Sequence, residues 1–200
     1  MAKKIILALL ILILILTTYV YFIQNDETIT VFIDGENVTV ETNARFINNS
    51  NLNKEICEYT LNIMNDPSSD ITTLKEGIVG ICNKYGIENP KIKIDSTIGE
   101  NQIPVIVHVD GTSMLPTLQD GQSVVLNKTK DIHDGDIVVA ESDEYGMIIK
   151  RVSEIDGDEI HLTSDNKNIE YEYEDGVLYE IKGINTWVGR SDICGVVINY

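Results

Sequence analysis

A serine and a lysine that stand 37 residues apart have the chemistry needed to attack a carbonyl carbon together. The serine is Ser113 and the lysine is Lys150. A serine hydroxyl is a weak nucleophile until a base removes its proton, and a neutral amine can be that base. Lys150 lies among apolar residues at 147–152, where burial would favour the neutral form. Lowering a lysine pKa from ~10.4 to roughly 7–8 costs about 3–5 kcal/mol, which is within reach of desolvation.

The residues around Ser113 suit a nucleophile at a strand-to-turn junction. Gly111 carries no side chain, so a substrate backbone could approach closely. Pro116 fixes its own φ, lacks an N–H group and favours an extended conformation for Leu115. A surface turn would use the same residue types, and Lys150 alone would be a solvated strand lysine. Because both features occur in one chain, the sequence favours catalysis over these alternatives.

Other catalytic or metal-binding patterns are not evident in the sequence. The three histidines, His108, His133 and His161, stand in no recognisable catalytic context, and His108 is predicted to be a structural or surface residue. No His or Cys pair has zinc-ligand spacing. The sequence therefore predicts neither a metal nor another cofactor.

Three cysteines are too few for a disulfide scaffold. Cys57 and Cys82 fall on neighbouring predicted helices, so a bridge between them is conceivable outside the cell. The alternative is that these two and Cys194 are buried thiols, since free cysteine behaves as a small hydrophobe.

The charge of the chain limits its partners. Fifteen basic and 32 acidic residues give a net charge of −17. Binding to nucleic acid needs clustered Lys and Arg, so this class of partner is not expected. A polybasic membrane-binding face is not expected for the same reason.

Residues 5–23 form an apolar run of 19 residues without a charge. At ~1.5 Å per residue, a helix of this length spans most of a ~30 Å hydrocarbon core. Two lysines precede the run and three aromatic residues lie near its end, which favours a cytoplasmic N-terminus and an interfacial exit. We therefore predict that residues 1–25 are an uncleaved single-pass anchor in the cell membrane, with the rest of the chain outside. A removed signal peptide is the alternative, although such peptides have a shorter apolar core and a small-residue cleavage site.

Residues 26–102 are predicted to form a small hairpin-plus-two-helix module. An Asp-Gly turn at 34–35 between two alternating stretches is a strong hairpin signal. Helical periodicity follows at 52–64 and 71–85, with Asp70 as a plausible N-cap of the second helix. No catalytic constellation occurs here, so a spacer or docking role is expected.

Residues 103–200 are predicted to form a mainly β domain, built as a bent sheet or a partly closed barrel. Short alternating stretches broken by Gly and Asp predict strands at 105–109, 123–126, 136–140, 147–152, 159–162, 177–181 and 194–198.

Four blocks occur in order in this part of the chain: GTSMLPTL at 111–118, DGDIVVA at 134–140, IKRV at 149–152 and SDN at 164–166. Together they resemble the serine–lysine peptidases of the type I signal peptidase and LexA-like repressor superfamily. The resemblance covers about half the chain. It implies a β-rich catalytic fold in which Ser113 attacks a peptide carbonyl and Lys150 is the general base. Water activated by the same lysine would then hydrolyse the acyl-enzyme.

The resemblance also implies supporting roles. The backbone N–H of Ser113 would donate to the oxyanion, a contribution of ~3–4 kcal/mol in comparable enzymes. Gly111 stands where some members carry a hydroxyl, so a second donor is unassigned. Ser164 and Asp165 match the block near the lysine, and Ser164 would orient Lys150. The alternative is that residues 165–166 are simply a turn after a strand.

The motifs point to two branches of the superfamily. The predicted anchor and the Ser113 block look like signal peptidase, whereas residues 162–166 are at least as similar to the repressor branch. Residues 187–196 resemble the closing strand of archaeal and endoplasmic-reticulum signal peptidases. Those enzymes use a histidine where this chain has Lys150, so the bacterial-style dyad is the better assignment.

The resemblance implies a membrane-anchored serine endopeptidase that removes signal peptides from exported precursor proteins with small residues before the cut. A self-cleaving regulator of the LexA-like branch or a specialised processing peptidase is one alternative. The repressor branch would need basic DNA-binding helices, whereas residues 52–86, which hold both predicted helices, have five acidic against three basic residues. A surface protein with a non-catalytic form of this fold is the other alternative.

Overall fold

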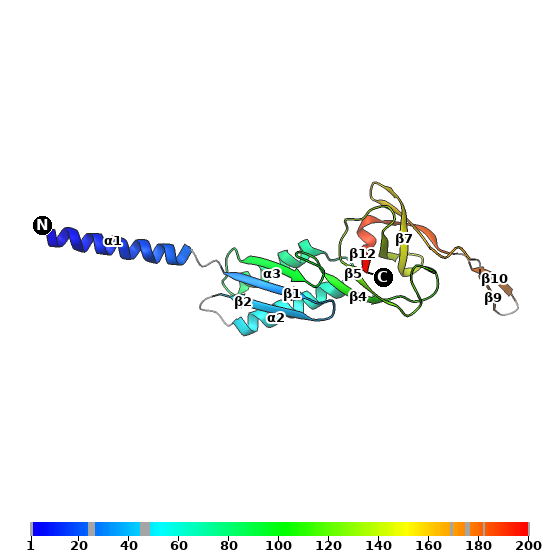
Figure 1. Ribbon diagram of the computed structural model, residues 1–200, viewed down its shortest axis with the longest axis horizontal. Coiled ribbons are helices and arrows are strands. Elements are labelled where there is room, and N and C mark those ends of the chain that lie inside the picture. Colours follow the sequence, from blue (N-terminus) through cyan, green and yellow to red (C-terminus); the bar gives the residue numbers. More distant parts are fainter. Residues whose placement is uncertain are drawn as a thin grey trace.

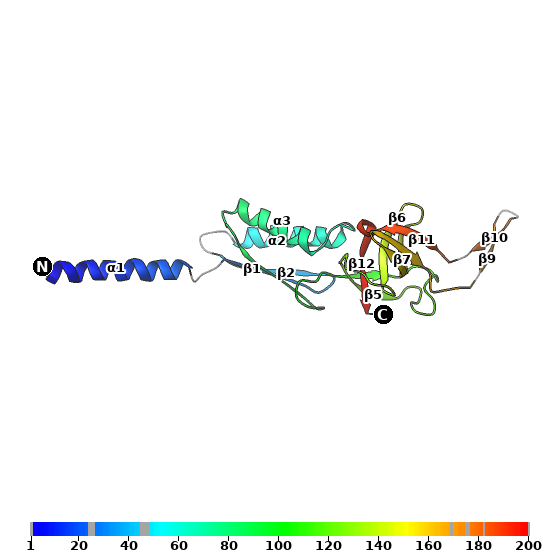
Figure 2. The same ribbon diagram turned by 90° about the horizontal axis from the view of Figure 1, so that it is seen from above.

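The computed structural model describes residues 2–23, 27–44, 49–168, 170–174, 177–181 and 183–199. Figures 1 and 2 show α1 at one end of an elongated molecule, followed by a small sheet with two helices and then by a second, strongly curled sheet. The helices are α1 (Ala2–Ile23), α2 (Asn49–Asn65), α3 (Ile71–Lys84) and the 3₁₀ turn η1 (Arg190–Asp192). The strands are β1 (Thr28–Ile33), β2 (Val38–Asn43), β3 (Lys91–Ser96), β4 (Pro104–His108), β5 (Ser123–Asn127), β6 (Ile137–Ser142), β7 (Gly146–Asp156), β8 (Glu159–Thr163), β9 (Glu170–Glu174), β10 (Val177–Ile181), β11 (Asn185–Gly189) and β12 (Ile193–Asn199).

Helix α1 covers the apolar run at the start of the chain. The leucine and isoleucine side chains described on it are 50–63% exposed. In the part of the chain that the structure describes, however, no helix is both long enough and apolar enough to cross a membrane. The predicted membrane anchor over residues 5–23 is therefore not confirmed.

The first sheet has the strand order β2-β1-β3. Strands β1 and β2 form the predicted hairpin, and Asp34 Oδ1 closes the turn by accepting hydrogen bonds from the N–H groups of Glu36 (2.9 Å) and Asn37 (2.7 Å). Gly35 has φ +108°, which explains the glycine at this position. Strand β3 pairs parallel to β1, so helices α2 and α3 form the crossover between them. No strand was predicted at β3, although its alternation of lysine and isoleucine is typical of a half-buried strand.

The two helices pack on one face of this sheet. The predicted N-cap at Asp70 is confirmed, because its carboxylate accepts hydrogen bonds from the N–H groups of Thr72 and Thr73. One apolar core forms between the sheet and the helices; among its members are Ile29, Val31, Ile33, Leu52, Ile56, Leu74, Ile78 and Ile94. Burying such side chains is the main favourable term in holding this part of the chain together.

The conceivable bridge between Cys57 and Cys82 is not formed. Both residues are free thiols, as is Cys194. Cys57 is half-buried and lies against the carbonyl oxygen of Val38 at 3.5 Å. Cys82 lies in the core, where burial raises its pKa to about 11.

The second sheet has seven strands in the order β11-β8-β7-β6-β12-β5-β4, and all neighbours are antiparallel. Strand β6 lies at its centre and is buried on both faces. Ile137 and Val139 belong to one apolar cluster, and Val138 and Ala140 belong to another. The prediction of a mainly β domain is confirmed, and the sheet curls as expected for it (Figure 2). Strands β9 and β11 had not been predicted.

Strand β4 joins the two sheets. Ile103, just before it, is buried in the core of the first sheet, and Val105 packs against the cores of both sheets. Lys128, which follows β5, is buried and donates a hydrogen bond to the carbonyl oxygen of Asp66 at the end of α2 (2.5 Å). The second sheet is therefore packed directly against the small helical layer.

Candidate active site

Ser113 lies in the loop between β4 and β5. The loop closes at its base, where the N–H of Val109 donates to the carbonyl of Gln122 and the N–H of Gly121 donates to the carbonyl of Val109, both at 2.9 Å. Met114 and Leu118 are buried in the apolar core and hold the loop on both sides of its turn. Buried anchors of this kind keep the half-buried Ser113 in a defined position.

Gly111 shapes the start of this loop. Its φ is +85°, a conformation that other residues rarely adopt, and its N–H donates to Asp120 Oδ1 at 2.8 Å. Because this N–H is already bonded, Gly111 does not supply the second oxyanion donor. Its place in the structure is that of a support for the loop.

Lys150 lies on β7 and its amine meets the serine hydroxyl. The distance from Lys150 Nζ to Ser113 Oγ is 2.8 Å, and Nζ also lies 2.9 Å from the carbonyl oxygen of Ile149. Strand β7 pairs with the buried strand β6, with Lys150 opposite Val138, so the lysine is only 3% exposed. Burial lowers its pKa from 10.5 to about 8. A neutral amine at this distance can accept the proton of Ser113 as its oxygen attacks.

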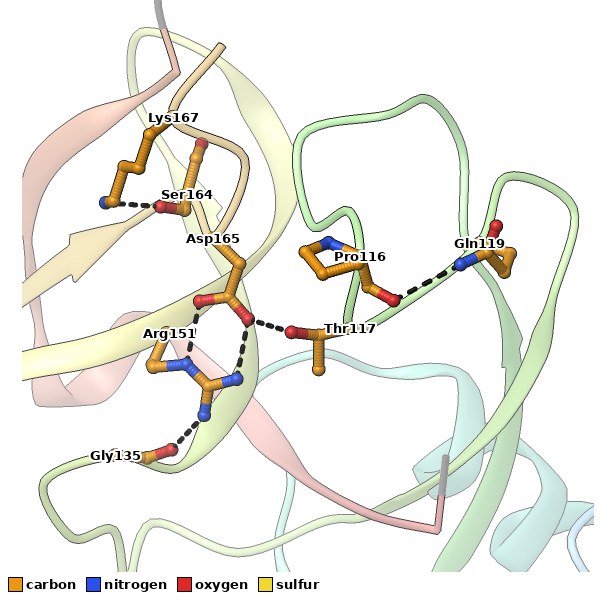
Figure 3. A network of polar contacts seen from close by, with 8 residues as sticks. All are labelled: Pro116, Thr117, Gln119, Gly135, Arg151, Ser164, Asp165 and Lys167. Carbon is orange, nitrogen blue, oxygen red and sulfur yellow. Dashed lines mark hydrogen bonds and ion pairs between the residues drawn. The ribbon is translucent and has the colours of Figure 1, made fainter.

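Asp165 connects the strand of the lysine to the loop of the serine (Figure 3). Its carboxylate accepts two hydrogen bonds from Arg151, from Nε at 2.7 Å and from Nη2 at 2.6 Å, and a third from Thr117 Oγ1 at 2.5 Å. Arg151 also donates from Nη1 to the carbonyl of Gly135. The hydrogen bond from Arg151 is the main cause that lowers the pKa of Asp165. The charged form of Asp165 therefore ties together the segments on either side of the dyad.

Asn166 makes the second connection to the nucleophile loop. Its backbone N–H donates to the carbonyl of Ser113 at 2.9 Å, and its side-chain Nδ2 donates to the carbonyl of Thr112 at 3.0 Å. The alternative prediction, that these residues are a turn after a strand, agrees with the bend that the structure has at 164–166 after β8. This bend also holds the loop of Ser113. No role had been predicted for Asn166, Thr117 or Arg151, although all three lie in the four sequence blocks.

Ser164 does not hold the lysine in the way that was predicted. Its side chain is buried, and its Oγ has no hydrogen-bond partner among the described residues. It therefore does not orient Lys150 through a hydrogen bond in this structure. Ser164 instead lines a separate cavity, whereas Lys150 Nζ makes its hydrogen bonds to Ser113 and Ile149.

A cavity of about 410 Å³ adjoins the dyad. Ser113 and Lys150 lie in its wall together with His108 and Asp110, and the remaining lining is apolar: Val107, Val139, Met147, Ile148, Ile149 and Ile184. His108 is exposed, as predicted for a surface residue, but it also lines this cavity. A mostly apolar pocket with a few convergent polar groups is the usual form of a binding site.

The other histidines lie elsewhere. His133 lies near Asp136, while His161 contacts Ser153 and stacks against Trp187. Within the described ranges there is no group of three or more His, Cys, Asp or Glu residues that could hold a metal ion.

The burial of Lys150 predicts that the dyad destabilises the fold at neutral pH. The folded state holds this amine at a pKa of about 8 instead of 10.5, so the unfolded chain binds more protons between these two pH values. The contribution of Lys150 to the free energy of unfolding consequently rises as the pH increases between these two pKa values. Lys150→Met should raise the free energy of unfolding at pH 7 by roughly 2–3 kcal/mol, since one unit of pKa corresponds to about 1.4 kcal/mol.

The measurement is denaturant unfolding of both proteins at several pH values. The gain should shrink between pH 8 and pH 10.5. Lys54→Met, which changes a lysine whose side chain is 76% exposed, is the control and should show no such pH dependence. A Lys150→Met protein that is no more stable at pH 7 than at high pH would contradict the desolvation of the amine.

Comparison with known proteins agrees with this geometry. A search of curated proteins and a search of solved structures found no match. A protein-family model described as Peptidase S24-like matches residues 80–185, more than half of the chain. The matched range contains the nucleophile loop, β7 and the bend at 164–166. The chain therefore belongs to the Peptidase S24-like family, and it is a serine peptidase of the S24/S26 type.

Proposed function

We propose that the protein is a serine endopeptidase in which Ser113 is the nucleophile and Lys150 is the general base. The observation that carries this proposal is the 2.8 Å contact between Ser113 Oγ and a buried amine whose pKa is lowered to about 8. In the first step Oγ bonds to the carbonyl carbon of the scissile peptide while Lys150 takes the hydroxyl proton. The protonated amine then gives that proton to the leaving nitrogen, and the C–N bond breaks.

The second half of the reaction reuses the same lysine. After the amine product leaves, Lys150 is neutral again and takes a proton from a water molecule that attacks the acyl-enzyme. That proton returns to Ser113 Oγ when the ester bond breaks. The backbone N–H of Ser113 is the proposed oxyanion donor in both halves, a contribution of about 3–4 kcal/mol in comparable enzymes.

Replacement of either member of the dyad should abolish cleavage. Ser113→Ala and Lys150→Ala are each expected to lower kcat by about 10³-fold or more, because the nucleophile and its base act as a unit. The assay is cleavage of a mixture of peptides or precursor proteins, followed by mass spectrometry. Ser123→Ala on β5 and Lys54→Ala on α2 change residues of the same types outside the site and are expected to cleave normally. Undiminished cleavage by either dyad variant would remove the pair from consideration.

The rate should follow the protonation of Lys150. Only the neutral amine can accept the proton of Ser113, so kcat/KM is expected to rise with pH through a pKa of about 8 and then level off. Below that value the rate should fall about tenfold per pH unit. A profile of kcat/KM between pH 5 and 10 tests this, and a plateau that already begins near pH 6 would contradict Lys150 as the base.

We further propose that the substrates are exported precursor proteins with small residues before the cut. The predicted specificity is consistent with the apolar cavity of about 410 Å³ beside Ser113. The family match favours a second candidate, self-cleavage as in the LexA-like branch. Purified protein incubated alone distinguishes the two. A Ser113-dependent fragment that forms at a rate independent of protein concentration would support self-cleavage.

We also propose, from the sequence, that α1 attaches the protein to a lipid bilayer with its N-terminus in the cytoplasm. The support is the uncharged run of 19 residues at 5–23 and the exposed leucine and isoleucine side chains of α1. The full chain is then expected to sediment with membranes and to resist extraction at alkaline pH. Leu10→Arg combined with Leu14→Arg should release it, because each arginine near a helix centre costs about 2.5–3.5 kcal/mol of insertion free energy. Extraction of the unaltered chain at alkaline pH would rule out the anchor.

A further inference from the structure

A second cavity lies next to the one that contains the dyad. It has a volume of about 260 Å³ and is lined mainly by polar residues from the bend after β8 and from the start of β11. Those that matter here are Ser164, Asn166, Lys167, Asn168 and Asn185. Ile184 lines both cavities, so the two adjoin.

The hydroxyl of Ser164 marks this cavity as a binding site. Ser164 is only 2% exposed, lines the cavity, and its Oγ has no hydrogen-bond partner among the described residues. A buried polar atom without a partner is unfavourable, and most such atoms in folded proteins are satisfied. In Figure 3 this hydroxyl points away from the hydrogen bonds that surround Asp165. A ligand group that enters the cavity would complete its hydrogen bonding.

The charge of the lining identifies the kind of group that fits. Lys167 lies in the wall, and its Nζ is held in place by the carbonyl oxygen of Ser164 at 2.6 Å. Among the described residues that line the cavity there is no acid, although the whole chain has 32 acidic residues against 15 basic ones. The nearest acid in sequence, Asp165, already accepts hydrogen bonds from Arg151 and Thr117 (Figure 3). A lysine, amide side chains and an unpaired hydroxyl together favour a carboxylate over a cation.

Asn166 connects this cavity with the nucleophile. It lines the cavity, while its N–H and its Nδ2 donate to the carbonyls of Ser113 and Thr112. An extended polypeptide that passes Ser113 would therefore place a nearby side chain beside Lys167.

We propose that this second cavity is a substrate subsite that recognises the carboxylate of an aspartate or glutamate close to the scissile bond. The proposal rests on the proposed peptidase function and names a feature of its substrates. Lys167 supplies the charge, Ser164 Oγ donates a hydrogen bond, and the amides of the wall complete the polar environment.

The test compares matched peptides. A peptide library is first cut with the full chain to find a cleaved sequence, and the Ser113→Ala variant identifies cuts that do not depend on the nucleophile. Peptides are then made that differ only by Glu or Gln at each position up to four residues from the cut. At one position the Glu peptide should be cleaved with a kcat/KM about tenfold higher, as expected for one charge-assisted hydrogen bond. The difference should lie mainly in KM and should shrink as salt is raised.

Variants of the cavity identify the residues responsible. Lys167→Met should reduce the Glu-to-Gln ratio to less than about twofold, since the charge that favours Glu over Gln is removed. Ser164→Ala should lower the ratio partially, whereas Lys54→Met, at an exposed site on α2, should not alter it. Thermal unfolding of each variant, compared with that of the unaltered chain, shows that it is folded.

Three results would overturn the proposal, and they distinguish a failure of the subsite from a failure of the peptidase function. If cleavage depends on Ser113 but shows no preference for Glu at any position, the proposed subsite is ruled out and the proposed peptidase function is still supported. Retention of the full preference in Lys167→Met would do the same. Equal results for the unaltered chain and Ser113→Ala with every peptide would remove both the peptidase function and the subsite.

Discussion

The arrangement of this domain depends on one constraint: the amine of Lys150 is kept away from water and lies beside the hydroxyl of Ser113. Lys150 lies 3% exposed on a strand that pairs with β6, which is itself buried on both faces. Burial alone is the cause of its lowered pKa. The remaining features of the domain, namely the apolar core under the loop and the clamp from the bend after β8, keep Ser113 within reach of this amine. The lowered pKa of Lys150 is thus a consequence of desolvation.

Arg151, the residue after Lys150, is also partly buried, but it keeps its charge instead of losing its proton more readily. Arg151 stays charged because Asp165 accepts two of its N–H groups, and the pair is satisfied further by Thr117 and Gly135. A paired and hydrogen-bonded charge tolerates partial burial, whereas an unpaired amine loses its proton more readily. Adjacent residues on one strand therefore serve two purposes. Lys150 carries an amine with a lowered pKa, and Arg151 fixes the position of the segments around it.

The two cavities share Ile184 in their described linings, and the polar cavity is also connected to the loop of Ser113 through Asn166. Asn166 contacts the nucleophile loop and also faces the polar cavity, so a substrate group bound there would touch a residue that holds Ser113. The apolar cavity beside the dyad and the polar cavity beside Lys167 differ in the side chains that they suit. Together they would read two different side chains of one extended polypeptide.

Much of the fold was predictable because its signals are local. The Asp-Gly turn, the Asp70 cap and the alternation in most strands depend on neighbours in sequence, and the structure has them where they were expected. The mainly β class followed from the same alternation. Strands β3, β9 and β11 had not been predicted, and the structure pairs each of them with another strand.

The sequence by itself determined the residue types of the dyad, Ser113 and Lys150, because a hydroxyl and an amine in those blocks have few other uses. Only the tertiary structure decided how they are held. The clamp by Asp165 and Asn166, the bonded N–H of Gly111 and the unpaired hydroxyl of Ser164 all depend on segments that lie up to 54 residues apart. Hydrogen bonds between such distant segments are set by the pairing of β6, β7 and β8. The spacing of residues along the sequence does not tell how close these segments lie in space.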